Sequence, residues 1–188
     1  MNKLSFREKI GYSVGAVGLD LSYGMFYSYL SIFLTNALGI SPLFLLVLAP
    51  LARLWDGIND PMIGMAVDRT NTKFGKYRPW LLGGVVLNAV VLCLLFNNIG
   101  FASGSVGLYI YVAILYVAWG MTNTLADIPY WSMIPSFASE EKDRNLLSTL
   151  ARAFSGLGQG IITIFSPIAV AYLGGAAGSK LDSMGSDT

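Results

Sequence analysis

Two aspartates stand one helical turn apart inside a long apolar segment of the sequence. Asp56 and Asp60 occur in the stretch RLWDGINDPMIG, with Asn59 between them. Ionised carboxylates are costly to hold in hydrocarbon, and these two repel each other if both are charged, because residues four apart share one helical face. Two carboxylates and an amide oxygen form a hard, all-oxygen ligand set that suits an alkali cation or a shared proton. We therefore predict a cation site here, with a purely structural polar cluster as the alternative.

A second polar group lies in the stretch WGMTNTLADIPYWS. Thr124, Asp127 and Trp131 are spaced i, i+3 and i+7, which places them on one helical face. A threonine hydroxyl can complete the shell of a cation, whereas a carboxylate beside a flat aromatic ring suits a sugar, whose C–H groups pack on the ring. Asp20 and Arg152 are further charges within apolar segments and are candidates for the same cavity. For Trp131 and Arg152 the alternatives are an interfacial anchor and a side chain that extends to the headgroups.

The elements that must position these residues are membrane-spanning helices. Of the 188 residues, 54% are hydrophobic and 12% are charged, which is about half the charged fraction of a soluble domain. Hydropathy and helix breakers predict five helices, over residues 10–38, 42–67, 79–99, 107–134 and 146–173. We predict an all-α integral membrane protein, in which residues 1–174 form one transmembrane bundle and residues 175–188 form a polar extracytoplasmic loop or a disordered end.

Basic residues alternate between the predicted loops. Lys and Arg occur in the N-terminal segment and in the loops after the second and fourth helices, whereas the loops after the first and third helices contain none. Basic loops stay on the cytoplasmic side, so we predict a multi-pass protein of the cytoplasmic (inner) membrane with a cytoplasmic N-terminus. Because transporters are commonly built from three-plus-three helical repeats, five helices also predict a chain truncated before helix 6.

Composition argues against several classes of function. The sequence contains no histidine, and Cys93 is its one cysteine, which removes histidine metal centres, histidine-based triads and a disulfide within the chain. A net charge of +1 gives no reason to expect nucleic-acid binding. We expect no enzymatic activity, and no cofactor beyond a coupling ion, Na⁺ or H⁺.

Three motifs together resemble those of a known transporter family. The stretches RLWDGINDPMIG, DRTNTKFGKYRPW and WGMTNTLADIPYWSMIP, in this order, resemble the glycoside–pentoside–hexuronide:cation symporter family. This family includes melibiose permease and belongs to the major facilitator superfamily. The resemblance covers about residues 4–173, and it implies the N-terminal helical bundle of a facilitator-type transporter.

The resemblance implies two groups of binding residues and one latch. The implied alkali-cation site consists of Asp56, Asn59, Asp60 and Thr124. The implied sugar site consists of Asp20, Asp127, Trp131 and Arg152. The loop sequence GMAVDRTNTKFGKYR implies a conformational latch at Asp68 and Arg69.

The resemblance leads to one main functional hypothesis and two alternatives. The main hypothesis is cation-coupled symport of a glycoside or related sugar, with this chain as the N-terminal half and with a glycoside, a monovalent cation and membrane lipids as its partners. The alternatives are a facilitator for a non-sugar solute such as a lipid, and a non-transporting truncated membrane protein. Leu19 and Asn123 stand where melibiose permease has a lysine and a tyrosine, so we expect a substrate other than melibiose.

Overall fold

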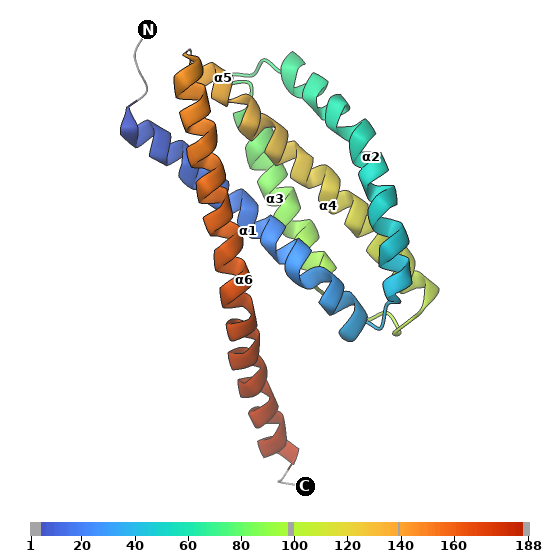
Figure 1. Cartoon of the computed structure of the whole chain (residues 1–188). Coiled ribbons are helices and arrows are strands. Elements are labelled where there is room, and N and C mark those ends of the chain that lie inside the picture. Colours follow the sequence, from blue (N-terminus) through green and yellow to red (C-terminus); the bar gives the residue numbers. More distant parts are fainter. Residues whose placement is uncertain (1–4, 98–99, 139, 186–188) are drawn as a thin grey trace.

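The regular elements of the described residues are all α-helices, as predicted. The structure is a computed structural model that describes residues 5–97, 100–138 and 140–185, with side chains in the last helix described as far as Ile168. The helices are α1 (Phe6–Asn36), α2 (Pro42–Arg69), α3 (Arg78–Leu95), α4 (Val106–Ser132), α5 (Ile134–Phe137) and α6 (Glu141–Gly185). The five long helices correspond to the five predicted ones, and α5 adds a single turn after α4 (Figure 1).

Local signals in the sequence explain where the helices begin. Ser5 and Glu8 form a capping box at the start of α1, in which the Ser5 backbone N–H donates to Glu8 Oε2 at 2.8 Å. Pro42 and Pro79 lie in the first turns of α2 and α3, where the missing N–H of proline has no cost. Ser105 caps α4 by accepting a hydrogen bond from the Leu108 backbone N–H.

Several predicted boundaries are wrong. α1 begins at Phe6 and α6 at Glu141, four and five residues before the predicted starts at 10 and 146. The third helix ends at Leu95 and not near residue 99, because Phe96 leaves helical geometry and the polar residue Asn97 follows. The last helix continues to Gly185, so residues 175–185 are helical where the sequence predicted a loop or disorder. Alanine, leucine and lysine in this stretch favour a helix and outweigh its glycines. Residues 186–188 of the predicted loop lie outside the described residues.

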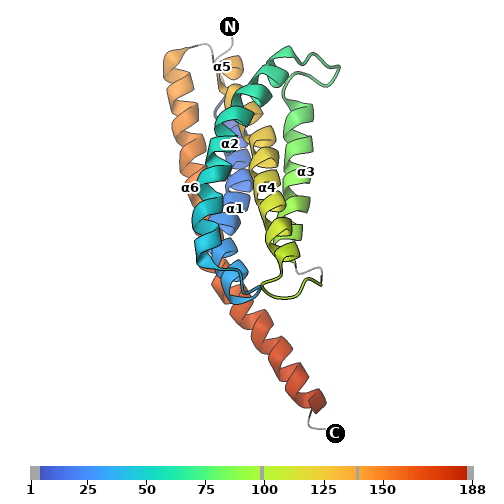
Figure 2. The same cartoon turned by 90° about the vertical axis from the view of Figure 1, so that its right-hand side faces the viewer.

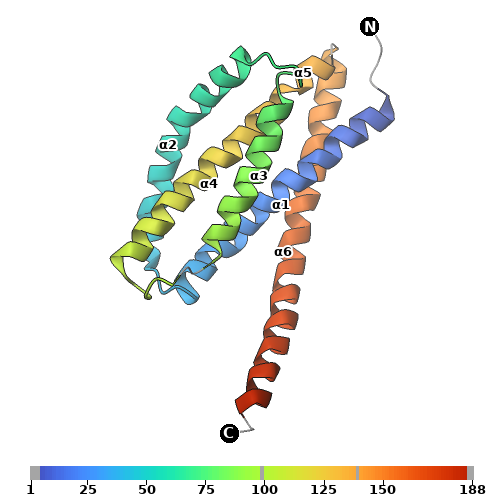
Figure 3. The same ribbon diagram turned by 180° about the vertical axis from the view of Figure 1, so that it is seen from behind.

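The helices pack so that α1 and α4 occupy the centre of the bundle. The closest helix pairs are α1 with α6, α3 with α4, and α2 with α4. Figure 2 shows α6 and α3 at opposite edges with the other long helices between them, and Figure 3 shows α6 crossing behind α1. The largest core cluster joins the second half of α1, including Phe26 and Leu34, to Val112 and Trp119 of α4. This cluster fixes α1 against α4.

Apolar helices indicate that this is a membrane protein. Within the described residues, three stretches are long and apolar enough to cross a bilayer by length and composition alone: Pro42–Arg69, Arg78–Leu95 and Val106–Phe137. In the apolar windows of the first two, only 11% and 17% of the residues are buried inside the bundle, so most of their side chains face outward, as lipid-exposed helices require. The predicted span in α1 is not among the three because Asp20 and several serines, tyrosines and glycines lower its hydropathy.

The basic segments lie together at one end of the bundle. The start of α1, the end of α2, α5 and the start of α6 all lie toward the top of Figure 1. At this end, Lys9 Nζ of α1 lies 2.7 Å from Asp143 Oδ1 of α6, and both side chains are largely buried. This arrangement agrees with the loop alternation from which the cytoplasmic orientation was predicted, and the orientation itself stays a prediction.

Close backbone contact between α3 and α4 gives a testable prediction. A Cβ atom on Gly84 would lie 2.6 Å from the backbone nitrogen of Ala126 and 2.7 Å from the carbonyl carbon of Leu125. Because backbone cannot move aside as a flexible side chain can, we expect Gly84→Ala to destabilise the bundle by about 1–3 kcal/mol in thermal unfolding in detergent. Gly83→Ala is the matched control, since its Cβ would meet nothing within 4 Å. Equal melting temperatures for the two variants would contradict this packing.

Candidate functional site

A polar cavity of about 80 Å³ lies between α1, α2 and α4. Its acidic lining comes from both groups of predicted residues: Asp56 and Asp60 of α2, and Asp127 of α4. Thr124, from the predicted cation site, also lines it. The structure therefore places one residue of the predicted sugar site, Asp127, in the same cavity as three residues of the predicted cation site. The other predicted sugar residues, Asp20, Trp131 and Arg152, are not among the residues that line it.

A hydrogen bond across the cavity links α2 to α4. Thr124 Oγ1 donates to Asp60 Oδ1 at 2.9 Å and also lies 3.1 Å from the Gly120 carbonyl oxygen one turn earlier. Gly120 provides a second close contact, because a Cβ atom there would lie 3.0 Å from Asp56 Oδ1. One turn of α4 thus faces both carboxylates of α2, and three of the four predicted cation ligands converge.

Arg53 is the nearest base to these acids. Its Nη1 lies 3.5 Å from Asp56 Oδ2, three residues later on the same helix, and its other terminal nitrogen donates to the Tyr27 hydroxyl. The Arg53 side chain is 64% exposed, so solvent screens much of this pairing. Among the described residues, Asp60 forms no ion pair, and Asp56 and Asp60 repel one another electrostatically. The cavity retains a negative charge that Arg53 does not fully offset.

Asn59 lies apart from the other predicted cation ligands. It is 4% exposed and is not among the residues that line the cavity. Its side-chain Nδ2 has no hydrogen-bond partner among the described residues. Each residue turns an α-helix by about 100°, so the neighbour of Asp60 points in a different direction from Asp60. Although the predicted cation site includes Asn59, this side chain does not line the cavity with Asp56 and Asp60, and its role as a cation ligand stays a prediction.

Three of the predicted sugar-binding residues form a connected unit. Trp131 Nε1 donates to Asp127 Oδ1 at 2.9 Å, and the Arg152 guanidinium carbon of α6 lies 4.9 Å from the centroid of the Trp131 ring. A cation over an aromatic face is stabilised by the ring's negative quadrupole. Arg152 therefore contacts the ring and does not simply extend to the membrane surface. Its positive charge also interacts electrostatically with Asp127.

Asp20, on α1, is the fourth residue of the predicted sugar site. It interacts electrostatically with Asp127 of α4, and it is partly exposed. It forms no hydrogen bond or ion pair with any other described residue. Asp20 therefore has acceptor atoms that remain free for a ligand, whereas one oxygen of Asp127 is already engaged by Trp131.

Two polar residues that were not among the predicted site residues line the same cavity. Asn123 Nδ2 donates to the Tyr23 hydroxyl oxygen at 2.6 Å, which joins α1 to α4 beside Thr124. Tyr23 stands one turn after Asp20, and Asn123 is a polar residue in an apolar helix that precedes Thr124 directly. These positions were the available signal, because polar side chains inside a span usually face the bundle interior.

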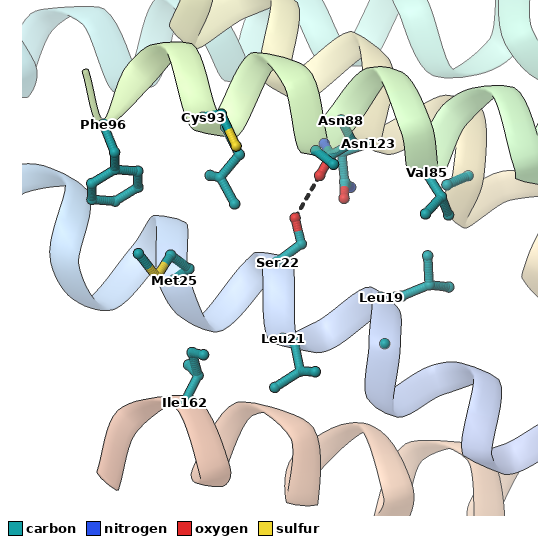
Figure 4. A pocket seen from close by; sticks show the side chains of 14 residues that line it. Leu19, Leu21, Ser22, Met25, Val85, Asn88, Cys93, Phe96, Asn123 and Ile162 are labelled. Atoms are coloured by element: carbon teal, nitrogen blue, oxygen red, sulfur yellow. Dashed lines mark hydrogen bonds between the residues drawn. The ribbon is translucent and has the colours of Figure 1, made fainter. Parts of the chain in front are cut away.

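A larger cavity, of about 380 Å³, lies between α1, α3 and α6 and is lined mainly by apolar side chains (Figure 4). Leu19 belongs to this cavity and does not line the polar one. Asn123 lines both, and the Ser22 hydroxyl donates to Asn88 Oδ1 at its edge. Leu19 and Asn123 are the two residues that were compared with melibiose permease above, and of these only Asn123 therefore lines the polar cavity.

The predicted latch residues are the last two residues of α2. Asp68 Oδ1 lies 2.8 Å from Lys76 Nζ, whereas Arg69 is exposed and forms no ion pair with a described residue. The hydrogen bond from Lys76 to Asp68 raises the pKa of the Lys76 ammonium above its ordinary value. Lys76 thus links the loop after α2 back to Asp68. A latch function of Asp68 and Arg69 stays a prediction.

The loop pairing predicts a change in the titration of Lys76. A lysine whose pKa is raised on folding contributes stability below its ordinary pKa, and this contribution is lost as the pH rises through the raised value. We expect Asp68→Asn to lower the pKa of Lys76, measured by NMR titration of the Lys76 side chain in detergent micelles. Asp143→Asn is the control, because Asp143 pairs with Lys9. An unchanged Lys76 pKa in Asp68→Asn would argue against the pairing.

Comparison with known proteins identifies a family of sugar transport proteins and several relatives named as carriers, transporters or symporters. The sequence profile of a family described as "MFS/sugar transport protein" matches residues 11–185. The chain is 31% identical to a raffinose carrier protein of Pediococcus pentosaceus over 93% of its length, and 31% identical to an isoprimeverose transporter of Lactiplantibacillus pentosus over 95%. It is also 31% identical over 96% of its length to the "Uncharacterized symporter YnaJ" of Bacillus subtilis. The chain spans 29%, 37% and 38% of the lengths of these three relatives.

Proposed function

The chain belongs to the MFS/sugar transport protein family, and from this premise we propose that it is the N-terminal part of a cation-coupled symporter for a glycoside or related sugar. In this proposal it lies in the cytoplasmic (inner) membrane with its N-terminus in the cytoplasm. The observation that carries the proposal is the single cavity in which the two acids of α2 lie beside the acid and the threonine of α4.

The α2 side of the cavity is suited to a monovalent cation. Asp56, Asp60 and Thr124 offer only oxygen atoms, which hard cations such as Na⁺ prefer, and a carboxylate can equally take up H⁺. Arg53 offsets part of the charge of Asp56 but leaves Asp60 unpaired. A bound cation would neutralise this remaining charge and draw α2 toward α4 at the Asp60–Thr124 hydrogen bond.

The α4 side of the cavity is suited to a sugar. The bond from Trp131 Nε1 fixes the edge of the ring against Asp127, so the orientation of the ring is set before a ligand binds. Asp20 and Asp127 would accept hydrogen bonds from sugar hydroxyls, and Arg152 would donate to sugar oxygens. Two relatives are named for the saccharides that they carry, raffinose and isoprimeverose, and the chemistry of Asp127 and the residues near it fits that class.

The two sides of the cavity are close together, which explains how cation binding and sugar binding would be coupled. Thr124 and Asp127 are separated by one turn of α4, and Asp60 interacts electrostatically with Asp127. Neutralising Asp60 with a cation would relieve the repulsion on Asp127 and improve its interaction with a sugar. Coupling of binding is reciprocal, so a bound sugar would strengthen cation binding by the same factor.

Removing the charge of Asp60 in α2 tests the proposed cation site. In the full-length symporter that carries this sequence, we expect Asp60→Asn to abolish the dependence of glycoside uptake into vesicles on Na⁺, Li⁺ or a proton gradient. Thr124→Val should weaken cation binding about tenfold, because a hydrogen bond to a charged group contributes about 1.5–3 kcal/mol. Thr149→Val is the control, since Thr149 donates to Asn145 within its own helix. Uptake by Asp60→Asn that still follows the cation gradient would disprove this assignment.

Removal of the indole N–H tests the sugar site. Trp131→Phe keeps an aromatic ring but loses the donor to Asp127, and we expect glycoside affinity to fall about tenfold in equilibrium binding. The matched control is Trp55→Phe on the outer face of α2, where the side chain is 41% exposed. If both variants bind glycoside as the original protein does, Trp131 is not a sugar-binding residue. Transport of a lipid with no response to glycosides would favour the non-sugar alternative.

A further inference from the structure

Tyr12 of α1 and Tyr130 of α4 form a reciprocal pair of hydrogen bonds. The Tyr12 hydroxyl donates to the Tyr130 carbonyl oxygen at 2.5 Å, and the Tyr130 hydroxyl donates to the Tyr12 carbonyl oxygen at 2.8 Å. The two rings stack with centroids 4.5 Å apart and planes 10° apart. Because each side chain binds the backbone of the other helix, the pair constrains both the separation and the register of α1 and α4.

The pair lies where α4 has lost part of its own hydrogen bonding. Tyr130 stands between Pro129 and Pro135, and proline has no N–H to donate to the carbonyl four residues earlier. The carbonyls of Leu125 and Trp131 therefore lack their normal helical donors. The Tyr12 hydroxyl supplies a donor from another helix to the carbonyl of Tyr130, in the middle of this weakened stretch.

The residues around the pair are closely packed, which restricts the movement of the two rings. Tyr130 is 4% exposed and packs with Ala16 and Ala151, which are small residues of α1 and α6. A Cβ atom on Gly15 would lie 3.3 Å from Tyr130 Cε2, so the ring of Tyr130 reaches the surface of α1. Phe137 of α5 packs edge-on against Tyr12, with centroids 5.8 Å apart.

The neighbours of the pair along each helix belong to the proposed sugar site. Trp131 follows Tyr130 directly, and the two rings meet edge to face with centroids 5.3 Å apart. Asp127 is one turn before Tyr130 and accepts the bond from Trp131. On α1, Asp20 lies two turns after Tyr12, about 12 Å along the axis.

We propose that Tyr12 and Tyr130 are positioning residues for sugar binding: their reciprocal bonds hold the end of α4 against α1, so that Trp131 and Asp127 stay in the orientation that meets a ligand together with Asp20. This inference rests on the proposed function for the identity of the ligand. Its structural core, that the pair sets the environment of Trp131, is independent of the ligand.

Two other tyrosines provide matched controls for this role. Tyr29 Oη donates to the Thr163 carbonyl oxygen at 2.7 Å and joins α1 to α6, and Tyr111 Oη donates to the Leu94 carbonyl oxygen at 2.8 Å and joins α4 to α3. Neither tyrosine lines the polar cavity. Their Phe variants remove the same kind of interhelical bond, so they report what loss of such a bond does to stability alone.

The experiment compares Tyr12→Phe, Tyr130→Phe and the double variant with Tyr29→Phe and Tyr111→Phe in the full-length symporter. We expect each single variant of the pair to weaken equilibrium glycoside binding about fivefold, as loss of one neutral hydrogen bond gives, while cation affinity changes less than twofold. The double variant should lose less than the product of the two single effects, because the bonds depend on each other. The control variants should lower the melting temperature without changing glycoside affinity. Equal glycoside effects in Tyr130→Phe and Tyr29→Phe would overturn the proposal.

A spectroscopic measurement separates this inference from the proposed function. The NMR signal of the Trp131 indole N–H, assigned through Trp131→Phe, should shift in Tyr12→Phe and Tyr130→Phe and stay unchanged in Tyr29→Phe. If the original protein binds no glycoside but the indole signal shifts as stated, the sugar function fails and the positioning of Trp131 by the tyrosine pair stands. If the indole signal shifts in neither Tyr12→Phe nor Tyr130→Phe, the positioning role is overturned, whatever the protein transports.

Discussion

Uncompensated negative charge inside an apolar bundle is the constraint on which the rest of this structure depends. Asp56, Asp60 and Asp127 line one small cavity, and Arg53 is the one base that lines it with them. An ionised group buried without a partner costs several kcal/mol, so the partial burial of Asp56 and Asp127 favours a cation, a proton or water as a partner for these acids. The open, exposed position of Arg53 and Asp60 gives such partners a route to the acids.

The helices around the cavity differ in how firmly they are held. α1 and α4 are joined by an aromatic core on one side of the predicted sugar residues and by the Tyr12–Tyr130 bonds on the other. α2 contacts the bundle mainly along α4, and the hydrogen bond from Thr124 to Asp60 joins the two helices at the cavity. If an ion binds at α2 and a sugar at α1 and α4 as proposed, α4 is the helix through which one site would influence the other.

The sequence was sufficient to predict the helical fold and the family, and it was less informative about contacts between helices. Hydropathy correctly predicted five long helices, and the i, i+3 spacing of Arg53 and Asp56 is compatible with the ion pair between them. The bond between Thr124 and Asp60 depends on the rotation of two helices about their own axes, which no single segment encodes. The same rotation places Asn59 away from the cavity. Tyr12 and Tyr130 gave no signal because an aromatic residue in an apolar helix is most simply interpreted as core packing.

The sparse packing of α2 has a consequence for how this protein should be handled and compared. Only 11% of its apolar window is buried, so hydrophobic contact contributes little to holding this helix against its neighbours. The Thr124–Asp60 hydrogen bond links this helix to α4 across the cavity, and the strength of such polar contact varies with the ions in the surrounding solution. If the proposed cation site is correct, samples prepared in sodium, potassium or choline salts would differ in the region of α2. Structural or thermal data from different buffers should be combined only after this helix has been compared between them.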